Sequence, residues 1–131
     1  MRQILIVEDD EAQLFILNRI LGEKYAVTTR RNGLGATKWL ADGNFPDLIM
    51  SDLNMPLLNG LELIENLKSS GIYREIPIIV LTGQPKQEDQ QRCMELGVDH
   101  FVTKPFNPES LHSLVSDVIK PFNHNKATGY E

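Results

Sequence analysis

The chain has 131 residues, a length that suits one domain with a substantial hydrophobic core. Hydrophobic residues make up 41% and charged residues 24%, and the formal net charge of -5 argues against non-specific binding to nucleic acid. No apolar run approaches the length of a membrane span, and no signal peptide opens the chain. The single cysteine, Cys93, cannot form an internal disulfide. We therefore expect a cytoplasmic protein that contacts neither membrane nor nucleic acid, with Cys93 as a packing residue.

Five short β-like runs alternate with helix-like segments along the chain. The expected strands are Gln3–Val7, Tyr25–Thr29, Asp47–Ser51, Pro77–Leu81 and His100–Thr103. Three of them are nearly continuous aliphatic stretches, as expected for parallel strands that are covered on both faces. The second run alternates between apolar and polar residues and the fifth is short, so both suit the edges of a sheet.

Apolar residues recur at helical spacing between these runs. Asp10 is expected to cap the first helix, with Gln13 as its reciprocal partner in a capping-box-like pair. Asn107 followed by Pro108 predicts the start of the last helix. The segment Pro85–Leu96 is mostly polar, so its helix should be weakly anchored. The three apolar stripes are Leu14, Leu17, Ile20 and Leu21; Leu61, Ile64 and Leu67; and Leu111, Leu114, Val115 and Val118.

The alternation of strands and helices predicts a doubly wound α/β domain with helices on both faces of a parallel sheet. We expect a flavodoxin-like (βα)5 sandwich whose five strands have the order 2-1-3-4-5. One domain is expected over residues 1–120, followed by a polar tail over residues 121–131 that we expect to be disordered.

Chemically active side chains follow the expected strands at their carboxyl ends, where open α/β sheets bind ligands. Glu8 and Asp9 follow the first strand, Asp52 the third, Thr82 the fourth and Lys104 the fifth. Taken singly, each has an ordinary explanation, such as a turn acid, a strand end or a surface lysine. Their coincidence at one edge of the sheet favours a common site.

Three carboxylates held close together repel one another and favour a bound cation. Mg²⁺ prefers one or two carboxylates together with a phosphate oxygen, and a carboxylate can act as a nucleophile towards phosphorus. Lys104 and Thr82 are suited to hold phosphoryl oxygens. Pro105 favours an extended backbone at Lys104 and leaves a cis peptide bond open. The backbone carbonyl of Asn54 is a further candidate metal ligand.

The sequence resembles the receiver domain of bacterial two-component response regulators over about residues 2–120. The resemblance rests on several short motifs that occur in order and at the spacing of the family. They are Ile4-Leu5-Ile6-Val7-Glu8-Asp9-Asp10, Pro46-Asp47-Leu48-Ile49-Met50-Ser51-Asp52-Leu53-Asn54-Met55-Pro56, Asn59-Gly60, Leu81-Thr82-Gly83 and Phe101-Val102-Thr103-Lys104-Pro105-Phe106.

The resemblance implies that the domain is not an enzyme but a phosphoacceptor with intrinsic autophosphorylation and autodephosphorylation activity. Asp52 would receive a phosphoryl group from a sensor histidine kinase or a histidine phosphotransfer protein. Mg²⁺, or Mn²⁺ in its place, would bind to Asp9, Asp52 and the backbone carbonyl of Asn54, with Glu8 helping through water. Lys104 would pair with the phosphoryl group and Thr82 would hydrogen-bond to it.

The resemblance also implies a switch. Thr82 would move and Phe101 would rotate inward, although an aromatic residue on an edge strand is also an ordinary packing residue. The altered surface would comprise the helix at 85–96, the strand at 100–103 and the last helix. It would contact an output protein or a second copy of the chain. Asn54 and Gln84 would tune the lifetime of the phosphoryl group.

Four alternatives compete with a single-domain receiver. A dehalogenase-like phosphatase would need an acid two residues after the nucleophile, where this chain has Asn54. A flavodoxin-like cofactor binder would need a phosphate loop after the first strand, where Glu8 and Asp9 would repel phosphate. A degenerate receiver would not need the complete set of acids, threonine and lysine. A receiver fragment of a longer regulator or hybrid kinase stays open.

Overall fold

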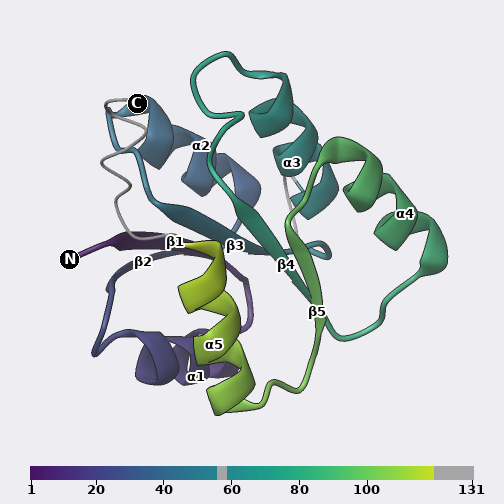
Figure 1. Ribbon diagram of the computed structural model, residues 1–131. Helices are drawn as coiled ribbons and strands as arrows, with labels where there is room; N and C mark the ends of the chain where they lie inside the picture. The colour runs from purple at the N-terminus through teal and green to yellow at the C-terminus, as the bar shows by residue number, and fades with distance from the viewer. Residues whose placement is uncertain (56–58, 120–131) are drawn as a thin grey trace, which may run out of the picture.

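Five parallel strands form one sheet in the order β2-β1-β3-β4-β5, and helices cover both of its faces (Figure 1). The computed structural model describes residues 1–55 and 59–119. The strands are β1 (Gln3–Val7), β2 (Ala26–Arg30), β3 (Leu48–Asp52), β4 (Ile78–Thr82) and β5 (His100–Thr103). The helices are α1 (Glu11–Leu21), α2 (Gly33–Ala41), α3 (Gly60–Ser69), α4 (Gln87–Leu96) and α5 (Pro108–Val118). The expected fold class and strand order are confirmed.

Three strands lie one residue further along the chain than the sequence predicts. β2, β3 and β4 begin and end one residue later, whereas β1 and β5 have the expected bounds. The reason is visible in the strand pairing, because Arg30 pairs with Val7, Asp52 pairs with Leu81 and Thr82 pairs with Thr103. These polar residues therefore belong to the ladder itself. The two edge strands, β2 and β5, are the ones expected at the edges.

Alternating side chains of the central strands divide the core into two layers. One layer lies between the sheet and α2, α3 and α4, and the other between the sheet and α1 and α5 (Figure 1). The apolar stripes predicted for α1, α3 and α5 supply buried residues to these layers. Burial of these side chains is the main stabilising term, at about 25 cal/mol per Å² of apolar surface.

Polar side chains fix the starts of the helices. Asp10 caps α1 by accepting from the backbone N–H groups of Ala12 and Gln13, and Asn107 caps α5 ahead of a proline in the first turn. Both caps are as expected. The proposed reciprocal bond from Gln13 is wrong, because the Asp10 N–H donates to the carboxylate of Glu8 instead, at 3.2 Å. A complete capping box does occur at the start of α3.

Helix α4 is held less firmly than its neighbours. Cys93 is its one buried residue, and its N-cap residue, Lys86, makes no side-chain capping bond. An exposed ion pair between Arg92 and Glu65, at 2.9 Å, links α4 to α3. Such exposed pairs contribute little to stability, so the expectation of a weakly anchored helix at this place is supported by the packing.

Two parts of the sequence prediction fall on residues that the structure does not describe. The expected tail over residues 121–131 and Pro56 of the loop after β3 lie outside the described residues. Within residues 1–55 and 59–119, none of the helices has both the length and the apolar character that crossing a bilayer requires.

Candidate functional site

The register of the parallel strands brings the sequence-predicted residues to one edge of the sheet. Val7 pairs with Ser51, so Glu8 follows β1 beside Asp52, the last residue of β3. Thr82 ends β4 and pairs with Thr103, the residue before Lys104. Residues that are far apart in the sequence therefore meet at the carboxyl edge, as expected for an open parallel sheet.

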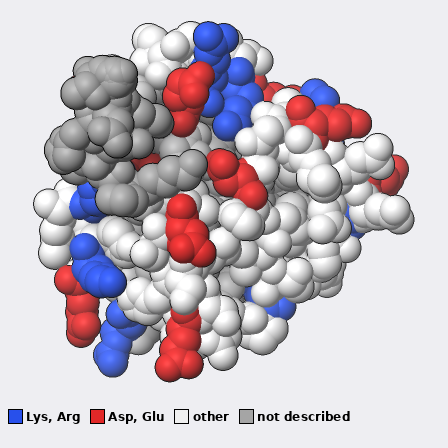
Figure 2. Space-filling view, in the orientation of Figure 1, with Lys and Arg blue, Asp and Glu red and all other residues white. Residues whose placement is uncertain are grey.

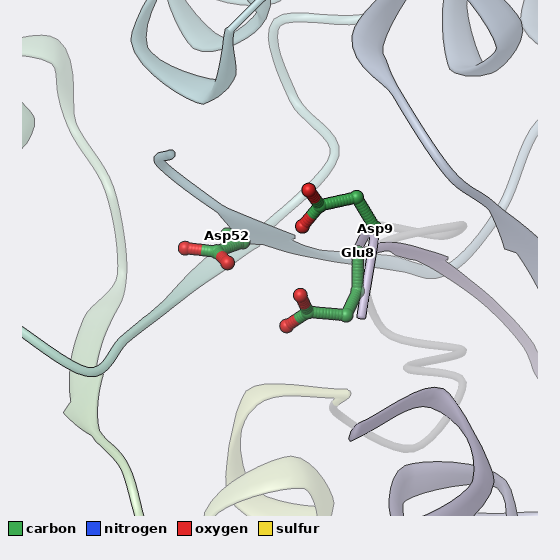
Figure 3. Close-up of side chains that lie close together, drawn as sticks. All are labelled: Glu8, Asp9 and Asp52. Atoms are coloured by element: carbon green, nitrogen blue, oxygen red, sulfur yellow. The ribbon is translucent and has the colours of Figure 1, made fainter. Parts of the chain in front are cut away.

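Three carboxylates gather at this edge. Each of Glu8, Asp9 and Asp52 offers an oxygen that lies within 4.8 Å of the others' oxygens. Figure 3 shows Glu8 and Asp9 leaving the end of β1 on either side, with Asp52 opposite them at the end of β3. Glu8 is completely buried and Asp52 is 6% exposed. Because nearby carboxylates repel each other most strongly where water is excluded, this arrangement requires a compensating cation.

The carboxylate of Asp52 is held in a fixed orientation by its own loop. Its Oδ1 accepts hydrogen bonds from the backbone N–H of Leu53 at 2.7 Å and of Asn54 at 3.3 Å. Its Oδ2 faces Lys104 Nζ at 3.2 Å. The two oxygens thus have distinct surroundings, and both are bonded to groups that stabilise negative charge.

Lys104 lies between two carboxylates. Its Nζ donates to Glu8 Oε1 at 2.8 Å and to Asp52 Oδ2 at 3.2 Å. Burial favours the neutral amine, but the hydrogen bond to Glu8 and the charge of Asp52 outweigh burial, and the pKa of Lys104 is raised. The lysine is therefore a fixed positive charge. Its peptide bond to Pro105 is cis.

Glu8 has both carboxylate oxygens engaged. Oε1 accepts from Lys104, and Oε2 accepts from the backbone N–H of Asp10 at 3.2 Å. Burial raises the pKa of Glu8 and the nearby charge of Asp52 adds to the rise, although the Lys104 hydrogen bond opposes it. The close pairing of Glu8 with Lys104 was not anticipated from the sequence. In the sequence, this pair could have been suggested only by the length of the glutamate side chain, which lets its carboxylate reach a lysine on another strand.

Thr82 lies at the edge with the acids, and Phe101 does not. Thr82 is buried, and its Oγ1 accepts from the Gln84 N–H at 3.3 Å. The backbone N–H of Lys104 donates to the Thr82 carbonyl at 2.8 Å, which ties β5 to the end of β4. Phe101 packs against the core layer shared with α2, α3 and α4, and it also lines a cavity of about 330 Å³ beside β5 and α5.

Gly60 is a site residue whose structural role the sequence did not disclose. A Cβ atom added there would lie 2.0 Å from the Asp52 carbonyl oxygen and 2.6 Å from Leu53 Cα. The Gly60 N–H donates to the Leu53 carbonyl at 3.0 Å. The first turn of α3 thus packs directly on the backbone that carries Asp52. The pair Asn59-Gly60 suggests a turn, but glycine is required at position 60 because the backbone of α3 approaches the backbone of Asp52 closely.

The donor set fits a small divalent cation. Asp9 and Asp52 offer carboxylate oxygens at the edge, and the chain continues from Asp52 to Asn54, whose backbone carbonyl is a further oxygen donor. Mg²⁺ prefers oxygen ligands of this kind and keeps several waters. Cys93, by contrast, is buried in the core, where burial raises the pKa of its thiol to about 11. It is a packing residue, as expected.

Comparison with known proteins agrees with this geometry. The family model for the response regulator receiver domain matches residues 4–116. A probable transcriptional regulator, ycf29 of Pyropia yezoensis, is 33% identical over 118 residues, which cover 89% of this chain and 53% of that protein. The chain thus spans about half the length of the first curated relatives it matches.

Two solved structures extend the comparison. The receiver domain of a signal transduction histidine kinase from Syntrophus aciditrophicus is 39% identical, with a TM-score of 0.83 and coverage of 91% of this chain and 90% of that one. The receiver domain of sensor histidine kinase PA1611 from Pseudomonas aeruginosa has a magnesium ion in its active-site cleft. It is 28% identical, with a TM-score of 0.81 and coverage of 90% and 97%. The chain belongs to the response regulator receiver domain family.

Proposed function

We propose that this domain is a signalling switch that accepts a phosphoryl group on Asp52. The observation that carries the proposal is the environment of the Asp52 carboxylate. It is nearly buried, with two backbone N–H groups on one oxygen and the Lys104 ammonium 3.2 Å from the other. A carboxylate needed only for stability has no reason to stand beside two further acids.

The phosphoryl donor is proposed to be a phosphohistidine on a sensor histidine kinase or on a histidine phosphotransfer protein. An oxygen of Asp52 attacks phosphorus, the bond between phosphorus and the histidine nitrogen breaks, and that nitrogen takes up a proton. Lys104 and the Thr82 hydroxyl would hold the phosphoryl oxygens, a role supported by the contact of Lys104 with Asp52 and by the burial of Thr82 beside it. Hydrolysis of the resulting acyl phosphate returns the carboxylate and releases phosphate.

The cofactor is proposed to be Mg²⁺, with Mn²⁺ as a substitute. Asp9, Asp52 and the Asn54 backbone carbonyl would hold it, with Glu8 beside them. The cation supplies charge neutralisation for phosphoryl oxygens and for the acids. The magnesium ion reported for the receiver of PA1611 supports this choice.

The output is proposed to leave through α4, β5 and α5. Phosphorylation adds negative charge at the edge beside Thr82 and Lys104, and both residues adjoin this surface. Helix α4 has one buried residue, so a small change in free energy can shift it. Thr82 and Phe101 are proposed as the moving residues. The receiving surface belongs to an output protein or to a second copy of the chain.

Asn54 and Gln84 are proposed to tune how long the phosphoryl group lasts. Gln84 is exposed and follows Thr82 by two residues, so its side chain adjoins the path of an attacking water. We expect Gln84→Ala to change the rate of dephosphorylation severalfold while the rate of phosphorylation changes less than twofold. Measuring loss of label from phosphorylated protein checks this, and an unchanged lifetime would contradict it.

Two further proposals concern the setting of the domain. The chain acts in the cytoplasm, either as a single-domain receiver or as the receiver part of a longer regulator or hybrid kinase. The second possibility stays open because the chain matches about half the length of its curated relatives.

We also propose that the chain does not contact nucleic acid directly. On the described residues of the face drawn in Figure 2, basic and acidic side chains lie next to one another.

The domain is proposed to be a phosphoacceptor with only intrinsic phosphorylation and dephosphorylation activity, not an enzyme acting on other substrates. Asn54 stands two residues after Asp52, and its neutral amide cannot act as a general acid.

The deciding experiment incubates the protein with acetyl phosphate and Mg²⁺ and locates the modification by mass spectrometry. We expect one phosphoryl group on Asp52, no incorporation in Asp52→Asn and none when Mg²⁺ is chelated. Asp47→Asn is the matched control, because it neutralises an acid at the opposite edge of the sheet and should leave incorporation intact. Wild-type protein that remains unmodified, or modification that persists in Asp52→Asn, would defeat the proposal.

A further inference from the structure

Helix α4 is joined to the rest of the domain by few contacts. Its one buried residue is Cys93, and its N-cap residue, Lys86, makes no side-chain capping bond. Most of its other residues are polar, so the burial of apolar surface holds it weakly. Local opening of such an element costs much less free energy than unfolding of the whole domain. A single polar contact can therefore decide how firmly α4 is held.

One polar contact joins α4 to α3, the helix beside it (Figure 1). Arg92 donates to Glu65 Oε2 through Nη2 at 2.9 Å and through Nε at 3.3 Å. Its Nη1 lies 3.5 Å from Glu95 Oε1 on the same helix. Over residues 1–55 and 59–119, no other side-chain hydrogen bond or ion pair connects α4 to another helix or strand.

Glu65 stands on a helix that is firmly held and that contacts the Asp52 backbone. Helix α3 begins with a complete capping box, and three of its leucine and isoleucine side chains are buried. Its first residue, Gly60, packs against the Asp52 carbonyl, where an added Cβ would lie 2.0 Å from the oxygen. Helix α3 therefore has little freedom to move away from Asp52. The bond from Arg92 attaches the loosely held α4 to this fixed helix.

The pair between Arg92 and Glu65 is exposed, with 45% of the Arg92 side chain and 40% of the Glu65 side chain accessible to solvent. An exposed pair changes an equilibrium constant by roughly twofold to fivefold. Such a factor is small against global unfolding, but it is a substantial share of the free energy that holds a helix with one buried side chain. The pair can therefore control the position of α4 without controlling the stability of the domain.

We propose that the Glu65–Arg92 pair is a latch, which holds α4 against α3 while Asp52 is unmodified and opens when Asp52 is phosphorylated. The inference rests on the proposed function, since α4 belongs to the proposed output surface. The free energy of the pair is then present in the unmodified domain and absent in the phosphorylated one, so the latch opposes the switch. A surface ion pair without this role would affect neither the opening of α4 nor the affinity of the site for a phosphoryl mimic.

Amide hydrogen exchange of the metal-free protein measures the opening of α4 without phosphoryl chemistry. Glu65→Gln removes the charge from α3 and leaves the sequence of α4 unchanged, so the intrinsic exchange rates of the α4 amides stay the same. We expect the amides in the middle of α4 to exchange about threefold faster in this variant. Amides of α1 should exchange at their wild-type rates. Equal α4 exchange in wild type and Glu65→Gln overturns the inference.

Two further variants assign the effect to the contact between the helices. Glu95→Gln is the matched control, because it removes the same charge and the second partner of Arg92 but keeps the link to α3. It should change α4 exchange by less than about 1.5-fold. Once Arg92→Met has removed the guanidinium, Glu65→Gln should have no further effect. A control effect as large as that of Glu65→Gln, or an undiminished effect in the Arg92→Met background, overturns the inference.

Binding of beryllofluoride in the presence of Mg²⁺ tests whether the latch opposes the switch. Because the pair is lost on binding, removing it beforehand should tighten beryllofluoride binding about threefold in Glu65→Gln, measured by fluorine NMR. Glu95→Gln should bind beryllofluoride with wild-type affinity, which excludes a long-range effect of the lost charge. Unchanged or weaker binding by Glu65→Gln overturns the inference.

The two proposals fail in different ways. If wild-type protein binds no beryllofluoride and acquires no phosphoryl group, the proposed function fails, and hydrogen exchange alone then decides whether the pair holds α4. If wild type binds beryllofluoride and α4 exchange does not respond to Glu65→Gln, the proposed function stands and the latch fails.

Discussion

Acidic side chains stand at both edges of the sheet, and the two edges use them in opposite ways. At the amino edge, Asp47 accepts from the Gln3 N–H at 2.7 Å and pairs with Arg2, while Asp99 accepts from the Ile78 N–H at 2.9 Å. At the carboxyl edge, three acids crowd within 4.8 Å around Lys104. Acidic residues complete the hydrogen bonding of strands at the amino edge, whereas at the carboxyl edge they need a nearby positive charge.

The difference shows that composition at a strand end does not define a site. A carboxylate at the amino edge meets backbone donors that the sheet leaves unpaired, so it stabilises the fold. A carboxylate at the carboxyl edge meets other carboxylates, so its stability depends on a cation. Substitutions at the two edges should therefore have different, and in one case opposite, effects on stability.

The largest effect is expected from removing the cation at the carboxyl edge. Lys104→Met leaves buried Glu8 and Asp52 without their partner, and we expect the free energy of unfolding to fall by about 3 kcal/mol in metal-free buffer. Denaturant unfolding measures it. Adding Glu8→Gln should recover most of the loss, because one buried charge is removed.

Arg31→Met is the control for this prediction, since its pair with Glu11 is exposed and should cost less than about 0.5 kcal/mol. If Lys104→Met costs no more than this control, the acids at the carboxyl edge do not depend on the lysine.

A second, smaller effect is expected from the packing that holds Asp52 in place. A Cβ at position 60 would lie 2.0 Å from the Asp52 carbonyl oxygen, so Gly60→Ala must displace α3 or the end of β3, at about 2 kcal/mol. Gly83→Ala is the matched control, because its nearest contact would be Lys104 Cδ at an ordinary 3.9 Å. Thermal unfolding compares the two, and equal melting temperatures would show that position 60 has room.

Much of this arrangement could be predicted from the sequence. Aliphatic runs identify strands because parallel strands are buried on both faces, and the residues after those runs identify the edge where Asp52 and Lys104 meet. The strand limits were displaced by one residue in three cases, because hydrophobicity does not reveal that Arg30, Asp52 and Thr82 still pair within the ladder.

Other features could not be predicted, because they depend on distances across the fold. Glu8 and Lys104 are separated by 96 positions, and their 2.8 Å bond requires the strand order, the loop after β5 and a specific lysine rotamer. The Asp10 N–H bonds to Glu8 and not to Gln13, which no local pattern indicates. Gly60 similarly carried a turn signal, whereas its role is close contact with the Asp52 backbone.

The same substitution type, aspartate to asparagine, should have opposite effects on stability at the two edges of the sheet. Asp47→Asn weakens a charge-assisted bond to Gln3 and the pair with Arg2, so stability should fall by about 1 kcal/mol. Asp52→Asn reduces repulsion from Glu8 and Asp9, so the metal-free protein should gain about 1 kcal/mol. Denaturant unfolding of the two variants tests the opposite signs, and a loss in both would remove the distinction.

The smallest effect is a dependence on pH that Glu8 at the carboxyl edge should produce. Burial raises the pKa of Glu8 above its ordinary value of 4.5. Its contribution to stability is therefore fully present below about pH 4.5 and is lost as the pH rises through the raised pKa. Lys104, whose pKa is raised above 10.5, stays charged throughout this window.

Denaturant unfolding of metal-free protein between pH 4.5 and 7 should reveal this term. Glu8→Gln lacks the titrating group, so the free energy of unfolding of the variant minus that of wild type should increase as the pH rises from 4.5 through the raised pKa of Glu8. Glu11→Gln, at an exposed position on α1, should give a difference that does not change with pH. A constant difference for Glu8→Gln would mean that burial at the carboxyl edge does not oppose the charge on Glu8. Glu8 would then be distinguished by its contacts with Lys104 and the Asp10 N–H and not by the free energy of its ionisation.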